Sequence, residues 1–204
     1  MSLELLGPTE LAAVVTYLEM RARPAEDIPP SALRLKPCFG MDLESYRALF
    51  RKVGAPWLWF SRLLLGDAEL GVVLNDPAYQ VLAVIDEAND EVGLLELDFR
   101  NDEECELTFV GLVPPLAGHG HGRWLLAEAV SRAWARPGVS RVHVHTCTLD
   151  HPAALAVYRR AGFIPYKRAV ERFTDPRLTR VLPLDCAPQI AVLGTPAAPS
   201  ARCA

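Results

Sequence analysis

The chain has 204 residues, of which 50% are hydrophobic and 23% are charged, which suits one large domain or one domain with a tail. Its net charge of −4 argues against non-specific binding to nucleic acid, which needs a basic face. The sequence has no apolar run near the roughly 18–20 residues of a membrane span, and no basic stretch that would begin a signal peptide. Because the five cysteines form no C-x-x-C pair, we expect free thiols and a cytoplasmic location.

Apolar periodicity and turn residues predict a mixed α/β chain. The expected elements are, in order, a strand over 11–20, a loop over 22–40, helices over 43–53 and 67–74, strands over 79–86, 92–100 and 105–113, a helix ending near 136, a strand over 141–147, a helix from about 150 to 162 and a strand over 163–173. Acidic turns separate the three central strands, which is typical of an antiparallel meander. A meander followed by a helix and a further strand predicts a mixed sheet with helices on both faces.

Local signals indicate several ends of these elements. Asp42 is placed to cap the first helix, and Gly162 stands where a C-terminal glycine would end the last one. Either Asp150 or His151 is placed to cap that last helix, whose first turn contains a proline. The aromatic stretch over 55–60 is interpreted as core, with the wall of an acceptor pocket as the alternative.

The C-terminal residues differ from the rest of the chain in composition. From Pro183 onward the sequence is rich in proline and alanine and carries little charge. We therefore expect one domain over 1–182 and a poorly ordered tail over 183–204.

The stretch 117–122, with the sequence AGHGHG, has the composition of a phosphate-binding loop. It lies between a predicted strand and a predicted helix. Glycine lets the backbone come close to a ligand, and the free N–H groups at a helix N-terminus point at an anion. We therefore expect an anion site formed by consecutive residues of this loop and helix start, namely Gly118, His119, Gly120, His121, Gly122 and Arg123.

Two motifs, together with the order of the expected elements, resemble the GNAT (Gcn5-related N-acetyltransferase) superfamily. The first is Arg/Gln-x-x-Gly-x-Gly/Ala, and the window 117–122 supplies both glycines but has Ala117 in place of the leading donor. The second is Asn-x-x-Ala-x-x-x-Tyr-x-x-x-Gly-Phe, and the stretch 151–163 matches it except that His151 replaces the asparagine. The resemblance covers roughly residues 11–173 and implies the GNAT-like acyl-CoA N-acyltransferase fold.

The resemblance implies acetyl-coenzyme A as cosubstrate, with its pyrophosphate on the glycine-rich loop and His151 also at the cofactor. It further implies that the fourth strand bulges and separates from the fifth, so that its backbone can bind the pantetheine arm. Counting back from the loop puts that bulge near Gly111, Leu112 and Val113. A backbone N–H there would also stabilise the oxyanion of a tetrahedral intermediate.

The implied reaction is direct attack of a neutral primary amine on the acetyl carbonyl, with Tyr158 protonating the leaving thiolate. Glu106 stands at the spacing used by a glutamate base in some members of the family. Asp98 falls opposite Glu106, and two facing carboxylates would raise one pKa. The alternative is a solvated acidic rim that attracts a cationic amine. Strand alternation places Glu106, Thr108 and Val110 on one face, and Cys105, Leu107 and Phe109 on the other.

The histidines also raise a metal hypothesis. His119 and His121, like His143 and His145, have chelate-like spacing, and Cys147 follows the second pair. Tetrahedral zinc usually needs three or four ligands with an ordered second shell. We therefore expect no metal, and we interpret the first pair as phosphate ligands.

The leading functional hypothesis is an acetyl-CoA-dependent N-acetyltransferase acting on a small or peptidyl amine. A second hypothesis is a non-catalytic CoA-binding module that acts as a sensor or subunit. A Rossmann-type nucleotide binder fits poorly, because the glycine-rich loop follows a meander rather than an initial β-α-β unit. We expect no nucleic-acid or membrane partner and leave a homodimer open.

Overall fold

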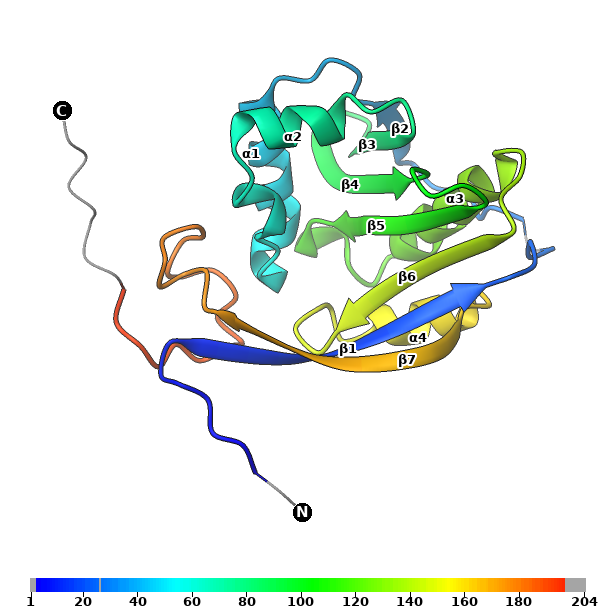
Figure 1. The fold of residues 1–204 in the computed structure, drawn as a ribbon. Coiled ribbons are helices and arrows are strands. Elements are labelled where there is room, and N and C mark those ends of the chain that lie inside the picture. Colours follow the sequence, from blue (N-terminus) through cyan, green and yellow to red (C-terminus); the bar gives the residue numbers. More distant parts are fainter. Residues whose placement is uncertain (1–2, 26, 197–204) are drawn as a thin grey trace.

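The computed structural model describes residues 3–25 and 27–196, which form one mixed sheet with helices on both faces (Figure 1). Within these residues the sheet has seven strands in the order β2-β3-β4-β5-β6-β1-β7. β5 and β6 are parallel, and every other neighbouring pair is antiparallel. The strands are β1 (Glu10–Met20), β2 (Arg34–Pro37), β3 (Tyr79–Ile85), β4 (Glu91–Asp98), β5 (Glu104–Leu112), β6 (Arg141–Cys147) and β7 (Ile164–Thr174).

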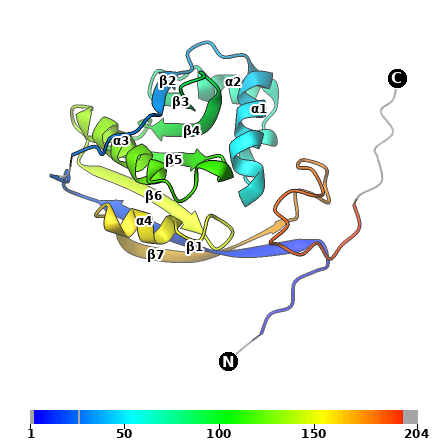
Figure 2. The same ribbon diagram turned by 180° about the vertical axis from the view of Figure 1, so that it is seen from behind.

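The helices cover the two faces of the sheet unequally. They are α1 (Leu43–Gly54), α2 (Asp67–Leu74), α3 (His121–Ala135) and α4 (Ala154–Arg160), with 3-10 turns at Ala55–Trp57, Ser61–Leu63 and Pro114–Leu116. On one face α1 contacts β4 and β5 while α2 contacts β3; α3 and α4 lie on the other face (Figures 1 and 2). Figure 1 shows that α1 and α2 leave the same face of β6, β1 and β7 without helix cover.

The helix α1 shows how the sequence positions this cover. The Asp42 side chain accepts a hydrogen bond of 3.0 Å from the Ser45 N–H, which confirms the predicted cap. Tyr46, Phe50 and Val53 recur at helical spacing and are at most 1% exposed against the sheet. Burial of each such side chain stabilises the fold by about 1.5–3 kcal/mol. On the opposite face, a larger apolar cluster packs α3 against β4, β5 and β6.

The predicted mixed sheet is confirmed, and the structure adds one strand to the predicted order. β2 lies in the segment that was predicted to be a loop, and it pairs with β3 from Arg34 opposite Ile85 to Pro37 opposite Leu82. A short edge strand that ends in proline has almost no alternation of its own. Its conformation is therefore decided by its partner strand, which the local sequence does not reveal.

The start of α4 also differs from the prediction. The helix begins at Ala154, and the turn before it is formed by His151, whose Nδ1 accepts a 3.1 Å hydrogen bond from the Ala153 N–H. Asp150 is not a cap, because its carboxylate is bound elsewhere, as described below. Gly162 takes a φ of +96° after the helix, so the prediction of a C-terminal glycine is confirmed.

The chain after β7 folds back around one arginine. The Arg177 guanidinium is bound to both carboxylate oxygens of Asp175 and donates to the carbonyl oxygens of Cys186, Ala187 and Ile190 at 2.9–3.3 Å. Residues 183–196 contain no helix or strand, but Ala187 is only 1% exposed. The division at 182/183 stays a prediction, and residues 197–204 of the expected tail lie outside the described residues.

Candidate active site

The strands β5 and β6 separate soon after they begin to pair. Their parallel register runs only from Glu104 opposite Arg141 to Glu106 opposite His143. Beyond this point β5 stays paired with β4, and β6 stays paired with β1. We call this parting, between residues 107–112 of β5 and 144–147 of β6, the β5–β6 divergence. It leaves one side of the β5 backbone without a strand partner.

The bulge in β5 lies at Thr108 rather than near Gly111, Leu112 and Val113. The register with β4 shifts between Leu107 and Phe109, whereas Gly111 and Leu112 pair regularly with Leu94 and Gly93. The extra residue reverses the side-chain alternation, so Phe109 packs with α1 and not with Leu107 against α3. The predicted shared face of Phe109 with Cys105 and Leu107 was therefore wrong.

The backbone groups at the end of β5 are divided between two sides. The Val113 N–H donates to the Val92 carbonyl at 2.9 Å, so it is already used on the β4 side. Because successive backbone groups of a strand alternate in direction, Leu112 and Val110 direct theirs toward the β5–β6 divergence. Leu112 thus stays a predicted cofactor residue, and Val110 is an additional candidate that the sequence did not indicate. Gly111 instead makes room for Trp59, whose Cη2 would lie 2.8 Å from an added Cβ.

The glycine-rich loop leads directly into α3. Gly118 and Gly120 have φ values of +82° and +85°, where a side chain would be strained. At Gly118, Gly120 and Gly122, an added Cβ would meet no protein atom within 4 Å. The glycines therefore leave the surface beside the helix N-terminus open, where the first amides have no partner within the helix. This geometry suits an anion.

The two loop histidines have different surroundings. His119 is exposed, whereas the His121 Nδ1 lies 3.0 Å from the Ser31 hydroxyl. The rings are 6.4 Å apart and nearly parallel. Ala117, which replaces the leading donor of the motif, is exposed in the turn before α3. The two histidines expected to replace the missing donor therefore have different surroundings. His119 lies at the surface, and His121 contacts Ser31 in the segment that precedes β2.

A groove runs from this loop between α3 and α4. Its volume is about 790 Å³, and residues 23–25 and 27–29 form one wall. Three arginines line it, namely Arg23, Arg123 and Arg160, together with Asp27. Arg123 directly follows the last glycine of the loop. The arginines of the groove thus place positive charge next to the helix N-terminus, whose geometry suits an anion.

Asp150 and Trp59 join the two sides of the β5–β6 divergence. One Asp150 oxygen accepts from the Thr146 hydroxyl and the Cys147 N–H, both at 2.8 Å. The other accepts from the Trp59 indole N–H at 3.2 Å. The sequence predicts Trp59 in the core, with the wall of an acceptor pocket as the alternative, and either Asp150 or His151 as a helix cap. The sequence signals were an aromatic stretch and an acid after a strand, but only the fold brings them together.

Tyr158 lies on α4 and is partly buried against the core. Its ring meets Phe163 edge to face at 6.0 Å. Burial and the nearby Asp150 carboxylate raise the pKa of Tyr158, so the phenol keeps its proton at neutral pH. His151, expected at the cofactor, stacks edge-on against Trp57 at 5.1 Å, and its Nδ1 is used in the turn before α4.

Glu106 lies on β5 where the divergence begins. The register places Asp98 opposite it, which confirms the predicted pairing. Asp98, however, is held by Arg100, with Nε 3.0 Å from Oδ1. Glu106 has the His145 Nδ1 at 3.4 Å, and this imidazole lowers the pKa of Glu106. The prediction that two facing carboxylates would raise this pKa was therefore wrong, because each acid has its own cation.

A second acid on the same face of the sheet is fully enclosed. Glu96 of β4 is 0% exposed and accepts a 2.6 Å hydrogen bond from the Tyr46 hydroxyl of α1. Its other oxygen accepts from the Tyr79 hydroxyl and lies 3.3 Å from the Arg62 guanidinium. Three donors thus surround one carboxylate beneath α1, where neither substrate nor water reaches it.

Within residues 3–25 and 27–196, no three His, Cys, Asp or Glu side chains gather in a way that could hold a metal ion. No helix in these residues is both long and apolar enough to cross a membrane.

Comparisons with known proteins agree with this geometry. A GCN5-related N-acetyltransferase from Sphaerobacter thermophilus superimposes with a TM-score of 0.57 at 20% identity, over 79% of this chain and 51% of that one. The spermidine N-acetyltransferase from Vibrio cholerae, solved with CoA and spermine, gives 0.55 at 20% identity, over 72% and 97%. An aminoglycoside acetyltransferase from an uncultured soil metagenomic sample, solved with trehalose, gives 0.51 at 20% identity, over 64% and 88%.

These likenesses concern the fold alone. The chain spans 51% to 66% of the length of the first four solved structures that it matches. No curated protein matches it. The sequence model of the Acetyltransferase (GNAT) family, in contrast, matches residues 44–163, which is more than half of the chain. The match includes the β5–β6 divergence, the glycine-rich loop and the Tyr158 helix, so the chain belongs to the GNAT acetyltransferase family.

Proposed function

We propose that this protein is an acetyl-CoA-dependent N-acetyltransferase that transfers acetyl to a primary amine. The observation that carries the proposal is the open glycine-rich loop at the N-terminus of α3, directly beside the β5–β6 divergence. A phosphate site that lies next to an unpaired strand edge suits a ligand that has a pyrophosphate and a long amide-bearing arm.

The cofactor would follow these features from one end to the other. The amides of Gly118 to Gly122 would bind the pyrophosphate, and Leu112 and Val110 would hydrogen-bond the pantetheine amides. The groove between α3 and α4 would take the nucleotide end, whose additional phosphate suits Arg23 and Arg160. His119 and His121 would supply the donor that Ala117 lacks. The His121 ring would either leave the Ser31 hydroxyl or keep that contact while it binds the phosphate.

The chemistry would take place where β5 and β6 part. A neutral amine attacks the acetyl carbonyl, and a backbone N–H on the open edge of β5 stabilises the oxyanion. Tyr158 gives its proton to the departing thiolate, and its raised pKa keeps that proton in place until the thiolate forms. Glu106 and its neighbour His145 are the acid–base groups nearest the start of the divergence.

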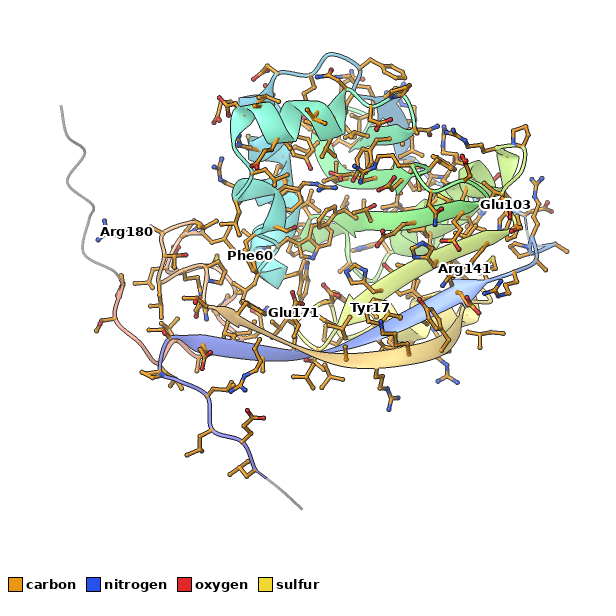
Figure 3. All side chains as sticks on the ribbon, in the orientation of Figure 1. Tyr17, Phe60, Glu103, Arg141, Glu171 and Arg180 are labelled. Carbon is orange, nitrogen blue, oxygen red and sulfur yellow. The ribbon has the colours of Figure 1, made fainter. Side chains whose placement is uncertain are left out.

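The acceptor that we propose is a small cationic amine. The uncovered face of the sheet, which Figure 3 shows around Tyr17, Arg141 and Glu171, also carries Glu106. Solved structures of similar fold carry the names of spermidine and aminoglycoside acetyltransferases, which act on amines of this charge. A peptidyl amine is the other candidate.

Cofactor binding is tested first, by the melting temperature with and without acetyl-CoA. Ligand that binds only the folded state raises the melting temperature by mass action. Gly120→Val should abolish the rise, because a side chain would fill the cradle. Gly138→Val is the matched control, since Gly138 has a φ of +90° and equally open surroundings at the other end of α3. A normal rise in Gly120→Val would show that the phosphate site is elsewhere.

Turnover is tested by the release of free CoA thiol with spermidine, spermine, aminoglycosides and short peptides. Tyr158→Phe should lower kcat by about 10²- to 10⁴-fold and leave acetyl-CoA affinity unchanged. A non-catalytic CoA-binding module is the second candidate, favoured by the missing donor at Ala117. Binding of acetyl-CoA without release of thiol from any of these amines would support that candidate and contradict the enzyme.

A further inference from the structure

His145 stands beside Glu106 at the start of the β5–β6 divergence. Glu106 is the last β5 residue in register with β6, where it lies opposite His143. His145 follows two positions later on β6, so its side chain projects from the same face of the sheet. The imidazole therefore lies where the unpaired edge of β5 begins, which is where the proposed acetyl transfer would occur.

Two contacts position the His145 imidazole, one through its Nδ1 and one with the ring of Tyr17. Its Nδ1 lies 3.4 Å from Glu106 Oε1. Tyr17 of β1 is its partner across the sheet, and the two rings are 5.7 Å apart at an angle of 38°. The side chain is still 45% exposed, and its contact with Glu106 is made through Nδ1. One nitrogen thus faces a carboxylate, while the exposed part of the ring leaves the other nitrogen for a substrate.

We propose that His145 is the proton acceptor of acetyl transfer, with Nε2 as the accepting atom, and that Glu106 is a positioning residue that orients it through Nδ1. This assignment rests on the proposed acetyltransferase function. It follows the general arrangement in which a carboxylate bound to one imidazole nitrogen fixes the tautomer and exposes the other nitrogen to the reaction.

The protons balance without a further reactant. The amine nitrogen forms a bond to the acetyl carbon and becomes positively charged in the tetrahedral intermediate. His145 Nε2 takes one proton from that nitrogen, and the C–S bond then breaks. The thiolate takes a proton from Tyr158. The imidazolium and the phenolate return to their starting forms by exchange with solvent, so the net products are the acetamide and free CoA thiol.

Charged groups from each strand near His145 favour this division of roles. The groups that face it are Glu106 on β5, Asp98 with Arg100 beyond it, His143 on the same strand, Tyr17 with Lys167 over its ring, Glu171 on β7 and Asp150. Glu106 above all, together with Asp150 and Glu171, stabilises an imidazolium, so the pKa of His145 is raised, and His145 in turn lowers the pKa of Glu106. A carboxylate with a lowered pKa is a poor base, whereas an imidazole with a raised pKa is a better one.

The two possible bases make opposite predictions for a pair of variants. His145→Gln should lower kcat/KM by about 10²- to 10⁴-fold and remove the acidic limb of its pH profile. Glu106→Gln retains an oxygen that can accept from Nδ1 but loses the charge. It should lower kcat/KM less than tenfold and move the acidic limb to lower pH, because the pKa of His145 falls. A loss of 10²-fold or more in Glu106→Gln, with an unmoved limb in His145→Gln, would overturn the assignment.

His143→Gln is the matched control, since it removes a histidine from the same strand whose ion-pair contact is with Glu104, at 3.7 Å. It should leave the acidic limb in place. Acetyl-CoA affinity should be equal in all variants, which separates this assignment from the cofactor site. Absence of acetyl-CoA binding in the unmodified protein would overturn the proposed function and the assignment together.

A measurement without turnover tests the geometry on its own. Nitrogen-15 NMR of the imidazole should show the Nδ1–H tautomer above the pKa of His145. The titration midpoint should fall in Glu106→Gln and stay unchanged in Glu104→Gln. An Nε2–H tautomer, or a midpoint that is the same with and without Glu106, would contradict the pairing even if the enzyme is active.

Discussion

Glu96 on β4 and Glu106 on β5 project from the same face of the sheet, but only Glu96 lies beneath α1. Two tyrosine hydroxyls and the Arg62 guanidinium enclose Glu96, which is fully buried. Glu106 lies beyond the cover of the helices, with a side chain that is 32% exposed and the His145 imidazole 3.4 Å away.

The difference shows that helix cover decides whether an acidic side chain on this sheet stabilises the fold or can influence proton transfer. A buried carboxyl group needs all of its hydrogen-bond donors to stay in place, so it contributes to the structure of the fold. A half-exposed carboxylate beside an imidazole can influence proton transfer at little cost to stability. We therefore expect substitutions at Glu96 to change folding, and substitutions at Glu106 to change the pH dependence of activity.

The largest expected effect on stability is that of Glu96→Ala. Removing one partner of a buried ion pair costs about 3–5 kcal/mol, because Arg62 then lacks its carboxylate and the hydroxyls of Tyr46 and Tyr79 lose the acceptor that they share. Urea unfolding followed by circular dichroism measures the loss. Glu106→Ala is the matched control on the neighbouring strand, and an equal loss of stability in both variants would contradict the comparison.

A smaller effect is expected from Tyr46→Phe, which removes one of the three donors to Glu96. Leaving a buried acceptor short of a donor costs about 1–3 kcal/mol. Tyr17→Phe is the control, because the Tyr17 hydroxyl makes no hydrogen bond within the described residues and its ring packs against His145. If the free energy of unfolding drops by the same amount in both, the Glu96 hydrogen bonds are not the cause.

The smallest effect is the coupling between Glu106 and His145, about 0.2–1 kcal/mol for a pair this exposed. The lowered pKa of Glu106 means that its contribution is lost as the pH falls through the folded-state value, below its ordinary 4.5. The raised pKa of His145 means that its contribution is lost as the pH rises through the folded-state value, above its ordinary 6.5. A double-mutant cycle with Glu106→Gln and His145→Gln should therefore give its largest coupling near pH 5–6 and none at pH 9; a coupling that persists at pH 9 would contradict an ion pair.

Much of the fold could be predicted because its signals are local. The Asp42 cap, the glycines around α3 and the position of Gly162 each depend on a few neighbouring residues, and the structure confirms the elements that they bound. The opposition of Asp98 and Glu106 was also correct, since a short turn fixes the register of a hairpin. Family membership followed from two motifs with defined spacing.

Other features depend on segments that meet only after folding. The bulge at Thr108 cannot be counted from the glycine-rich loop, because an extra residue in a strand shows only in its pairing with β4. Trp59 and Asp150 are 91 residues apart and meet across the β5–β6 divergence. Likewise β2 becomes a strand only against β3.

The sequence by itself thus determined the family, the position of the glycine-rich loop and the order of the elements other than β2, because capping, glycine conformations and periodicity are set within a few residues. The tertiary structure alone decided that Glu96 is buried and that Glu106 is accessible beside an imidazole. Glu96 and Glu106 have the same chemistry and similar strand contexts, and they differ because α1 covers one and β6 brings His145 to the other.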